Sequence, residues 1–357
     1  MEVYRTSISE PPAWRLNYRI GSGAFGTVFL EKVQTRGMES PELWAVKRIP
    51  RNLPNFSPKQ SQAEIKTLQA LSNPERFVEF RSCYEDTYYV YIAMEYIPTG
   101  DMSETFANGY RWNEGDTRVV IKQLLQGLVV MHKEGITHRN LKPENIFLSL
   151  PEVGTRSLHV KIGGFSISKH IPLSNDSTYL KTTVGTPGYT APEMYDTSKP
   201  KTNTVDIWSL GCILYRMLAG SQLFNDPFEV LKYSLNASAQ SLALENRGLS
   251  PTCVIFLHDV LQPTPEDRPS AEHCLKTGWA MSGDIGSGGC IGSDIYSRLS
   301  KIALAAPDIN TFSDMAVHQG VDKTSIAESL GTYSKWLCLQ TDSKNLTIHH
   351  LMGRTSE

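Results

Sequence analysis

The chain changes in pattern near residue 98, from short strand-like runs to helical periodicity, and this change constrains its fold most. Between residues 14 and 93, apolar residues fall in short runs rich in β-branched and aromatic side chains, such as Thr27–Leu30 and Leu43–Ile49. One helix interrupts these runs after Ser57-Pro58, which supplies a cap and a first-turn proline. These features predict a small β-rich lobe that contains one helix.

After residue 98 the apolar residues repeat at helical spacing. Residues 207–218 are almost continuously apolar over the length of a helix, which predicts a buried helix. A small β-rich lobe followed by a larger helical lobe is an α+β, bilobal arrangement. The helix after Pro58 is predicted from the apolar spacing of Ile65, Leu68 and Leu71. The first long helix of the second lobe is predicted in the same way, from Val119, Val120, Leu124, Leu125, Leu128 and Met131.

Bulk composition excludes several classes of protein. Lys and Arg number 35 against 37 Asp and Glu among 357 residues, so the net charge of −2 does not favour a nucleic-acid partner. No apolar run approaches the length of a transmembrane helix, and no signal or lipidation pattern is present. The six Cys lie apart, without metal-ligand spacing. We expect an intracellular protein, cytoplasmic or nuclear, with no membrane and no nucleic-acid partner.

A glycine-rich run in the first lobe is a candidate phosphate site. Residues 21–28 read Gly-Ser-Gly-Ala-Phe-Gly-Thr-Val, and glycines let backbone N–H groups approach phosphate oxygens closely. Such a run alone is equally compatible with a plain glycine turn. Lys47 follows inside an apolar strand, where a buried cation requires an anionic partner. Glu64 on the predicted helix is the candidate partner.

The motif His138-Arg139-Asn140-Leu141-Lys142-Pro143-Glu144-Asn145 resembles the catalytic loop of a eukaryotic protein kinase. The resemblance, of the Ser/Thr type, covers residues 14–280 in order and spacing. It implies a kinase domain with lobes at 14–97 and 98–280, preceded by an extension over 1–13. A Gly/Ser-rich stretch at 281–293 reads as a linker, and 294–357 as a weakly structured tail with a short helix over 295–304. The other matching segments are Met94–Ile97, Gly185–Glu193, Asp206–Gly211 and Glu266–Pro269.

The resemblance implies a role for each matching residue. Lys47 would contact nucleotide phosphates, Glu95 and Ile97 the adenine edge, and Asp101 the ribose or a substrate side chain. Leu68, His138 and Phe165 would form a hydrophobic column. Arg268 would pair with Glu193, and Asp206 would brace the catalytic loop. The complete set of nucleotide-binding candidates is Ile20, Gly21, Ser22, Gly23, Ala24, Phe25, Gly26, Thr27, Val28, Ala45, Lys47, Glu64, Glu95, Ile97, Asp101 and Phe147.

The chain departs from the family at two catalytic positions. Asn140 stands where the family has its catalytic Asp, and a neutral carboxamide cannot accept the proton of a substrate hydroxyl. Gly164 stands where the family has the Asp of its Asp-Phe-Gly motif, which leaves Asn145 as the single metal-ligand candidate. A nearby acid could substitute, and Asp176 and Glu193 are the candidates. Lys142 remains at a catalytic-loop position.

These departures favour a pseudokinase that binds ATP weakly, without a requirement for Mg²⁺, and serves a protein partner as a scaffold or allosteric regulator. A divergent but active Ser/Thr kinase is the alternative from the enzyme class. A nucleotide-free interaction module is the third, in which Lys47 and Glu64 form only a brace between the lobes. Hydroxyl residues within 164–193 could be phosphorylated, with Arg139 as a phosphate receptor, although an ordinary exposed loop would have the same composition. The candidates are Ser166, Ser168, Ser174, Ser177, Thr178, Tyr179, Thr182 and Thr183. His349 and His350 are expected at the surface.

Overall fold

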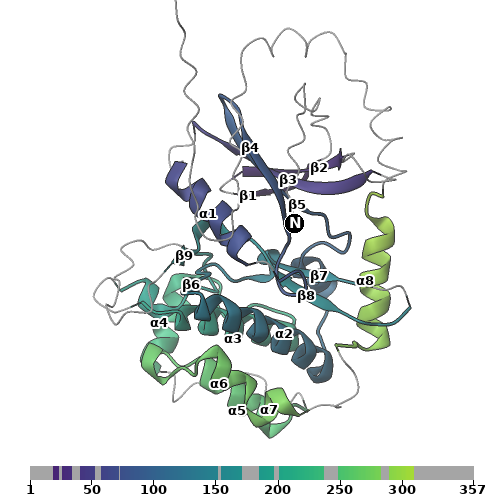
Figure 1. Ribbon diagram of the computed structural model, residues 1–357. Helices are drawn as coiled ribbons and strands as arrows, with labels where there is room; N and C mark the ends of the chain where they lie inside the picture. The colour runs from purple at the N-terminus through teal and green to yellow at the C-terminus, as the bar shows by residue number, and fades with distance from the viewer. Residues whose placement is uncertain are drawn as a thin grey trace, which may run out of the picture. The chain divides into compact units, whose positions relative to one another are not determined.

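The computed structural model describes most of the chain and divides it into two compact units (Figure 1). The first unit holds the described residues before 58 together with Arg81–Tyr96, and the second holds those of Pro58–Phe80 and Ile97–Pro307. The helix predicted inside the first lobe therefore groups with the second unit. The described residues are 19–23, 26–33, 41–52, 58–71, 73–151, 154–170, 185–196, 201–236, 248–282 and 289–308.

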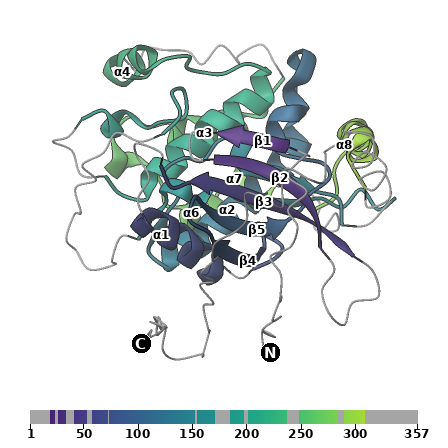
Figure 2. The same ribbon diagram turned by 90° about the horizontal axis from the view of Figure 1, so that it is seen from above.

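The first unit is built on a five-stranded antiparallel sheet. Figure 2 shows the strands side by side in the order β1-β2-β3-β5-β4. A Cβ on Gly26 would lie 2.4 Å from the carbonyl oxygen of Arg48 on the paired strand, so glycine is required there for close backbone approach. The strands are β1 (Arg19–Gly23), β2 (Gly26–Val33), β3 (Glu42–Pro50), β4 (Phe80–Glu85) and β5 (Tyr89–Glu95).

The two faces of this sheet differ because side chains alternate along β3. Val46 points to one face, where it joins Tyr91 and Ala93 in a buried cluster. Ala45 and Lys47 point to the other face, and the strand register pairs Lys47 with Val28 on β2. Alternation therefore places Val28, Ala45 and Lys47 on a single face, whereas Thr27, which pairs with Arg48, lies on the other.

The second unit begins with α1 (Pro58–Ala70), whose first residue is the proline predicted to start a helix. Ile65, Leu68 and Leu71 are buried, as the helical spacing predicted. This apolar side packs α1 against the 3₁₀ turn η3 (Phe165–Ile167).

Two long helices form the centre of the second unit. α2 (Glu114–Lys133) starts at Asn113, whose side chain accepts a hydrogen bond from the backbone N–H of Asp116 at 2.8 Å, and it buries the predicted stripe from Val120 to Met131. α3 (Thr204–Ala219) is buried along nearly its whole length, as expected for residues 207–218. None of the helices in the described ranges is long and apolar enough to cross a membrane.

Shorter elements complete the second unit. The antiparallel strands β7 (Ile146–Ser149) and β8 (His159–Ile162) connect the catalytic-loop motif to the turn at Gly164. The remaining elements are η1 (Met102–Gly109), β6 (Ile136–Thr137), η2 (Pro143–Asn145), β7 (Ile146–Ser149), β8 (His159–Ile162), β9 (Lys169–His170), η4 (Pro192–Met194), α4 (Pro227–Asn236), α5 (Pro251–Val260), η6 (Pro265–Asp267), α6 (Ala271–Leu275), α7 (Gly278–Met281) and α8 (Ser293–Ala305).

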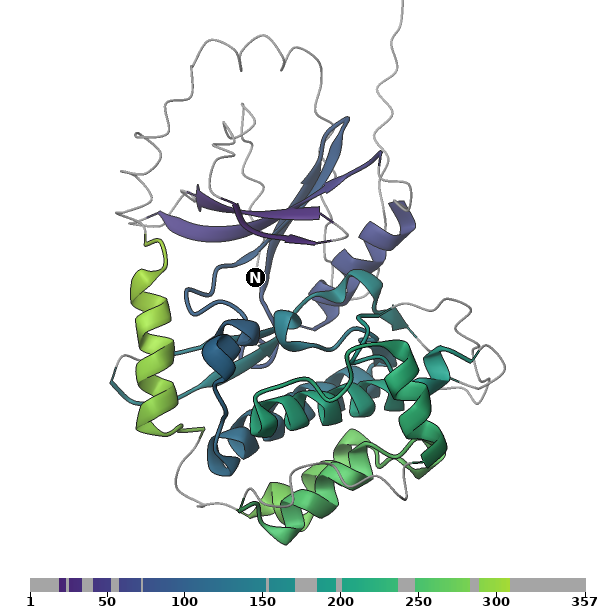
Figure 3. The same cartoon turned by 180° about the vertical axis from the view of Figure 1, so that it is seen from behind.

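Helix α8 extends the second unit beyond residue 280, at the position of the short helix predicted over 295–304 (Figure 3). Ile295 and Leu299 are fully buried, and Arg298 donates a hydrogen bond to the carbonyl oxygen of Ala107 at 2.8 Å. The end of the predicted linker is also anchored, because the N–H of Ile291 donates to the carbonyl oxygen of Arg156 at 3.0 Å. These contacts hold the short helix predicted at the start of the tail. His349 and His350 lie outside the described residues.

Candidate functional site

The backbone of the catalytic loop is held by one buried carboxylate. Oδ2 of Asp206 accepts from the N–H of His138 at 2.9 Å, and Oδ1 accepts from the N–H of Arg139 at 2.8 Å. His132 Nε2 lies 3.0 Å from the same carboxylate. Burial opposes ionisation, but the hydrogen bonds and the nearby histidines hold the pKa of Asp206 below its usual range. Arg139 adopts a positive φ of 64°, so these bonds stabilise a tight turn.

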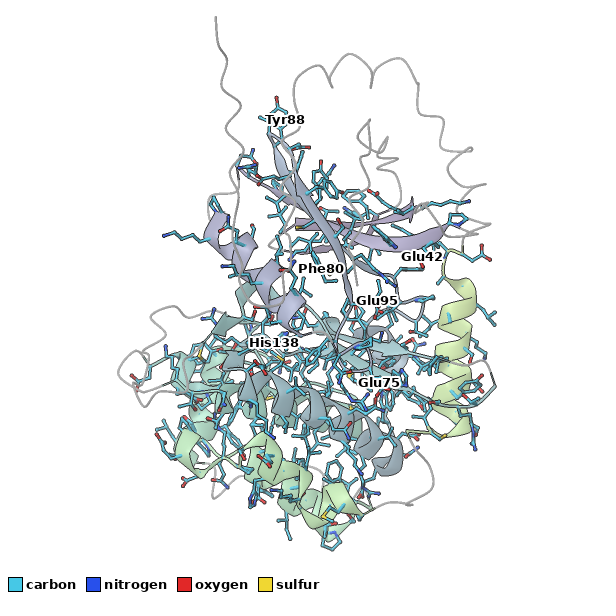
Figure 4. All side chains as sticks on the ribbon, viewed as in Figure 1. Glu42, Glu75, Phe80, Tyr88, Glu95 and His138 are labelled. Carbon is cyan, nitrogen blue, oxygen red and sulfur yellow. The ribbon has the colours of Figure 1, made fainter. Side chains whose placement is uncertain are left out.

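His138 is a neutral structural residue at the centre of this loop (labelled in Figure 4). Burial lowers its pKa. Its Nδ1 accepts from the N–H of Asn140 at 3.2 Å, so its Nε2 donates to the carbonyl oxygen of Gly163 at 2.8 Å. Its ring packs edge to face against that of Phe165, with 5.4 Å between the ring centroids. The ring of Phe165 also packs against that of Phe77, with 6.3 Å between the centroids. Phe77 is a member of this apolar group that the sequence did not identify.

Asn140 presents a carboxamide whose oxygen is already engaged. Its Oδ1 accepts a hydrogen bond from the hydroxyl of Thr186 at 3.1 Å. Thr186 was not among the candidate site residues, although it belongs to a segment used to identify the family. Lys142 lies nearby in sequence, with its Nζ 3.9 Å from Glu144. The carboxamide of Asn140 is not a proton acceptor comparable to a carboxylate.

The turn at Gly164 leaves no room for a side chain. Gly164 has φ 73° and ψ 44°, and a Cβ there would lie 2.2 Å from Oδ1 of Asn145. Nδ2 of Asn145 donates to the carbonyl oxygen of Asn140 at 2.7 Å. The described residues contain no group of three or more His, Cys, Asp or Glu that could hold a metal ion. A single neutral amide fits Mg²⁺ poorly, because this cation prefers charged oxygen ligands in an octahedral arrangement.

Glu64 has a partner in the Gly-Phe-Ser turn. Its carboxylate is buried, and Oε1 accepts a hydrogen bond from the hydroxyl of Ser166 at 3.1 Å. Ser166 stands where the family motif has glycine, and no sequence pattern predicted this contact. The pairing of Glu64 with Lys47 remains a prediction, since these residues belong to different units.

The glycine-rich candidates form the hairpin of β1 and β2. Gly21 pairs with Val28, Ser22 with Thr27 and Gly23 with Gly26. Ile20 is partly exposed at the start of the hairpin, and Glu95 ends β5. The phosphate-binding role of this hairpin remains a prediction. Ala24 and Phe25 lie outside the described residues.

Three nucleotide candidates lie in the second unit. Ile97 is buried, and Asp101 caps η1 by accepting from the N–H of Ser103 at 2.8 Å. Burial raises the pKa of Asp101. The backbones of Phe147 and Asp101 form an isolated antiparallel β-bridge. The ring of Phe147 lies against Gly163, so close that a Cβ added to Gly163 would be 2.9 Å from the ring. The structure thus brings Asp101 and Phe147 together beside the Gly163-Gly164 turn.

One of the two acid candidates, Glu193, is held in an ion pair. Both carboxylate oxygens of Glu193 accept from Arg268, at 2.6 and 2.7 Å, and both side chains are fully buried. Glu193 is therefore engaged in the predicted ion pair. Asp176 lies outside the described residues, as do the hydroxyl candidates Ser174, Ser177, Thr178, Tyr179, Thr182 and Thr183.

Comparisons with known proteins agree with this geometry. The model of the protein kinase domain matches residues 14–280. A probable myosin light chain kinase of Dictyostelium discoideum is 29% identical over 274 residues, covering 75% of this chain and 83% of the relative. The human calcium/calmodulin-dependent protein kinase type 1B is 32% identical over 274 residues, covering 76% of each chain. The type 1 kinase of Caenorhabditis briggsae is 33% identical over 267 residues, covering 73% of this chain and 70% of the relative.

The family model spans most of the chain, and relatives above 30% identity are matched over more than two thirds of their length. The strand order of the first unit and the helical architecture of the second are those of a kinase fold. The chain belongs to the protein kinase family.

Proposed function

We propose that this protein is a pseudokinase: a member of the kinase family with little or no phosphoryl transfer, which serves a protein partner as a scaffold or allosteric regulator. One observation carries the proposal. Asn140 and Gly164 lie at the two positions where the family places carboxylates, and the contacts around them are neutral hydrogen bonds.

The two losses differ in weight. A general base contributes roughly 10²–10⁴ in rate, and phosphoryl transfer passes through a loose transition state, so loss of the base alone would leave a slow enzyme. Loss of the charged metal ligand also removes the group that neutralises and orients the γ-phosphate. Together the two losses leave negligible transfer.

Nucleotide binding is a separate part of the proposal. The β1–β2 hairpin, Lys47 and the apolar residues Val28 and Ala45 retain the features that bind ATP in the family. Without a metal, the phosphate charge would rest on lysines and backbone N–H groups, so we expect weak binding of ATP that does not require Mg²⁺. The named relatives are a myosin light chain kinase and a protein kinase, which suggests that the partner is another protein.

Thermal unfolding with millimolar ATP, with and without Mg²⁺, tests binding. A rise in the unfolding temperature that is the same in both conditions is expected, with Lys47→Ala abolishing it. Autophosphorylation of the purified protein with labelled ATP tests the lack of transfer. Incorporation that Lys47→Ala removes would overturn the pseudokinase proposal.

A second candidate is a divergent active Ser/Thr kinase. Lys142 and residues 186–189, Thr-Pro-Gly-Tyr, favour it, because they resemble the Ser/Thr branch of the family. Mg²⁺-dependent phosphorylation of a Ser/Thr peptide would support this candidate. A third, a nucleotide-free interaction module, would be supported if neither ATP condition changed the unfolding temperature.

A further inference from the structure

The carboxamide of Asn145 occupies the space of a side chain at residue 164. A Cβ on Gly164 would lie 2.2 Å from Oδ1, 2.4 Å from Cγ and 2.9 Å from Nδ2 of Asn145. Contacts this short exceed any tolerable overlap, so a side chain at 164 and the present position of Asn145 exclude one another.

The backbone of the turn has little freedom to relieve this overlap. The N–H of Gly163 donates to the carbonyl oxygen of Asn145 at 2.9 Å, and its carbonyl oxygen accepts from His138. Phe147 and Val78 pack against Gly163 so closely that an added Cβ would lie 2.9 Å from each. The movable part is therefore the Asn145 side chain, and its rotation would break the hydrogen bond to the carbonyl oxygen of Asn140.

We propose that Asn145 is a positioning residue, which fills position 164 and ties the catalytic loop to the Gly163-Gly164 turn, instead of serving as a metal ligand. Gly164 and Asn145 are then mutually dependent. The site takes no divalent cation, because the one candidate amide ligand is used to close the loop. This last statement rests on the proposed function, whereas the dependence between the two residues does not.

A double-mutant cycle tests the dependence. Gly164→Ala, Asn145→Ala and the double variant are compared with the parent protein by thermal unfolding. We expect Gly164→Ala to lower the unfolding temperature by about 4 °C or more, and to cost much less when Asn145 is already Ala. Alanine at residue 164 has the same unfavourable positive φ in both backgrounds, so this contribution cancels. The remaining difference between the two changes in unfolding temperature measures the overlap with the Asn145 side chain.

Gly109→Ala is the matched control. Gly109 has nearly the same φ, 67°, but an added Cβ there would meet nothing within 4 Å. We expect its cost to be the same with Asn or Ala at residue 145. Equal costs of Gly164→Ala in the two backgrounds would overturn the proposal. Failure of both Gly164→Ala and the double variant to fold would also overturn it, whereas recovery of folding in the double variant alone would support it.

A spectroscopic readout separates positioning from general stability. In a ¹⁵N–¹H spectrum, the side-chain amide signal that disappears in Asn145→Ala belongs to Asn145. We expect Gly164→Ala to move this signal and Gly109→Ala to leave it in place. An unmoved signal in Gly164→Ala would contradict the assigned role.

Addition of millimolar Mg²⁺ to the parent protein tests the metal statement by itself. We expect no change in the unfolding temperature or in the Asn145 amide signal, and a shift of that signal on titration would overturn it. Neither measurement involves ATP or phosphoryl transfer. An active parent protein would refute the proposed function while leaving the Asn145–Gly164 dependence intact.

Discussion

In the second unit, the charged residues that support the fold are present, whereas the carboxylates that take part in the family's reaction are absent. Asp206, Glu193 and Arg268, which hold the catalytic loop and the segment after it, are fully buried, charged and hydrogen-bonded. Positions 140 and 164, where the family places reacting carboxylates, hold an amide and a glycine. The charges that build a kinase fold are therefore separable from those that perform its reaction.

The largest expected effect is a gain of activity. Asn140→Asp combined with Gly164→Asp supplies both carboxylates, and we expect phosphate transfer to a Ser/Thr peptide to rise by at least about 10² and to require Mg²⁺. The new side chain must displace Asn145, so this gain should come with lower stability. The measurement is the initial rate with and without EDTA.

Asn140→Asp combined with Gly164→Asn is the control for this repair, since it adds the same bulk without the charge. Equal rates in the Asp and Asn versions would mean that the metal ligand is not what the site lacks. No gain in either would mean that the defect extends beyond these two positions.

The next effect is a loss of stability on breaking a buried ion pair. Arg268→Met leaves the carboxylate of Glu193 buried without its partner, and we expect a loss of about 3–5 kcal/mol in the free energy of unfolding, measured in urea. Adding Glu193→Leu should recover much of the loss, because the isolated charge is then gone. A single variant within about 1 kcal/mol of the parent would show that the pair does not hold this segment.

Asp206→Asn should cost somewhat less, about 1.5–3 kcal/mol at neutral pH, because the amide keeps one acceptor for the loop N–H groups. The folded pKa of Asp206 is lowered, so its contribution is present above the unfolded value near 3.9 and is lost as the pH falls through the folded value. The difference between the parent and the variant should therefore shrink in acid. A difference that stays constant from pH 7 into the acid range would contradict the assigned anchoring role.

The smallest effect concerns Ser166. Ser166→Ala removes the hydrogen bond to the buried Glu64 and should cost about 1 kcal/mol, with faster amide hydrogen exchange in α1. Ser166→Thr keeps a hydroxyl and serves as the control. Unchanged amide hydrogen exchange in α1 of Ser166→Ala would show that Ser166 does not position this helix.

Much of the fold could be predicted because local patterns carry it. The apolar spacing of α1 and α2, the Ser57-Pro58 pair before α1 and the continuous apolar run of α3 predicted the places of these helices in the chain. Helix α8 also lies where a short helix was predicted, but its burial could not be predicted. The burial involves distant partners such as Ala107, which accepts a hydrogen bond from Arg298, 191 residues later in the chain.

The candidate site was predicted less completely, for a physical reason. Motif spacing indicated the positions of Asn140, Asn145 and Gly164, because each residue's chemistry is a property of its own side chain. The contacts of Thr186 and Ser166 could not be read in this way, since both residues are common surface types and only the folded chain brings them to Asn140 and Glu64.

The sequence by itself determined the family and the absence of two carboxylates, because both depend only on which residues stand at matched positions. Tertiary structure alone decided what occupies the space those carboxylates would use. At residue 164 that space is occupied by Asn145, which donates a hydrogen bond to the backbone of Asn140, while Phe147 and Val78 pack against the neighbouring Gly163. Packing is a property of neighbours distant in sequence, and no motif records it.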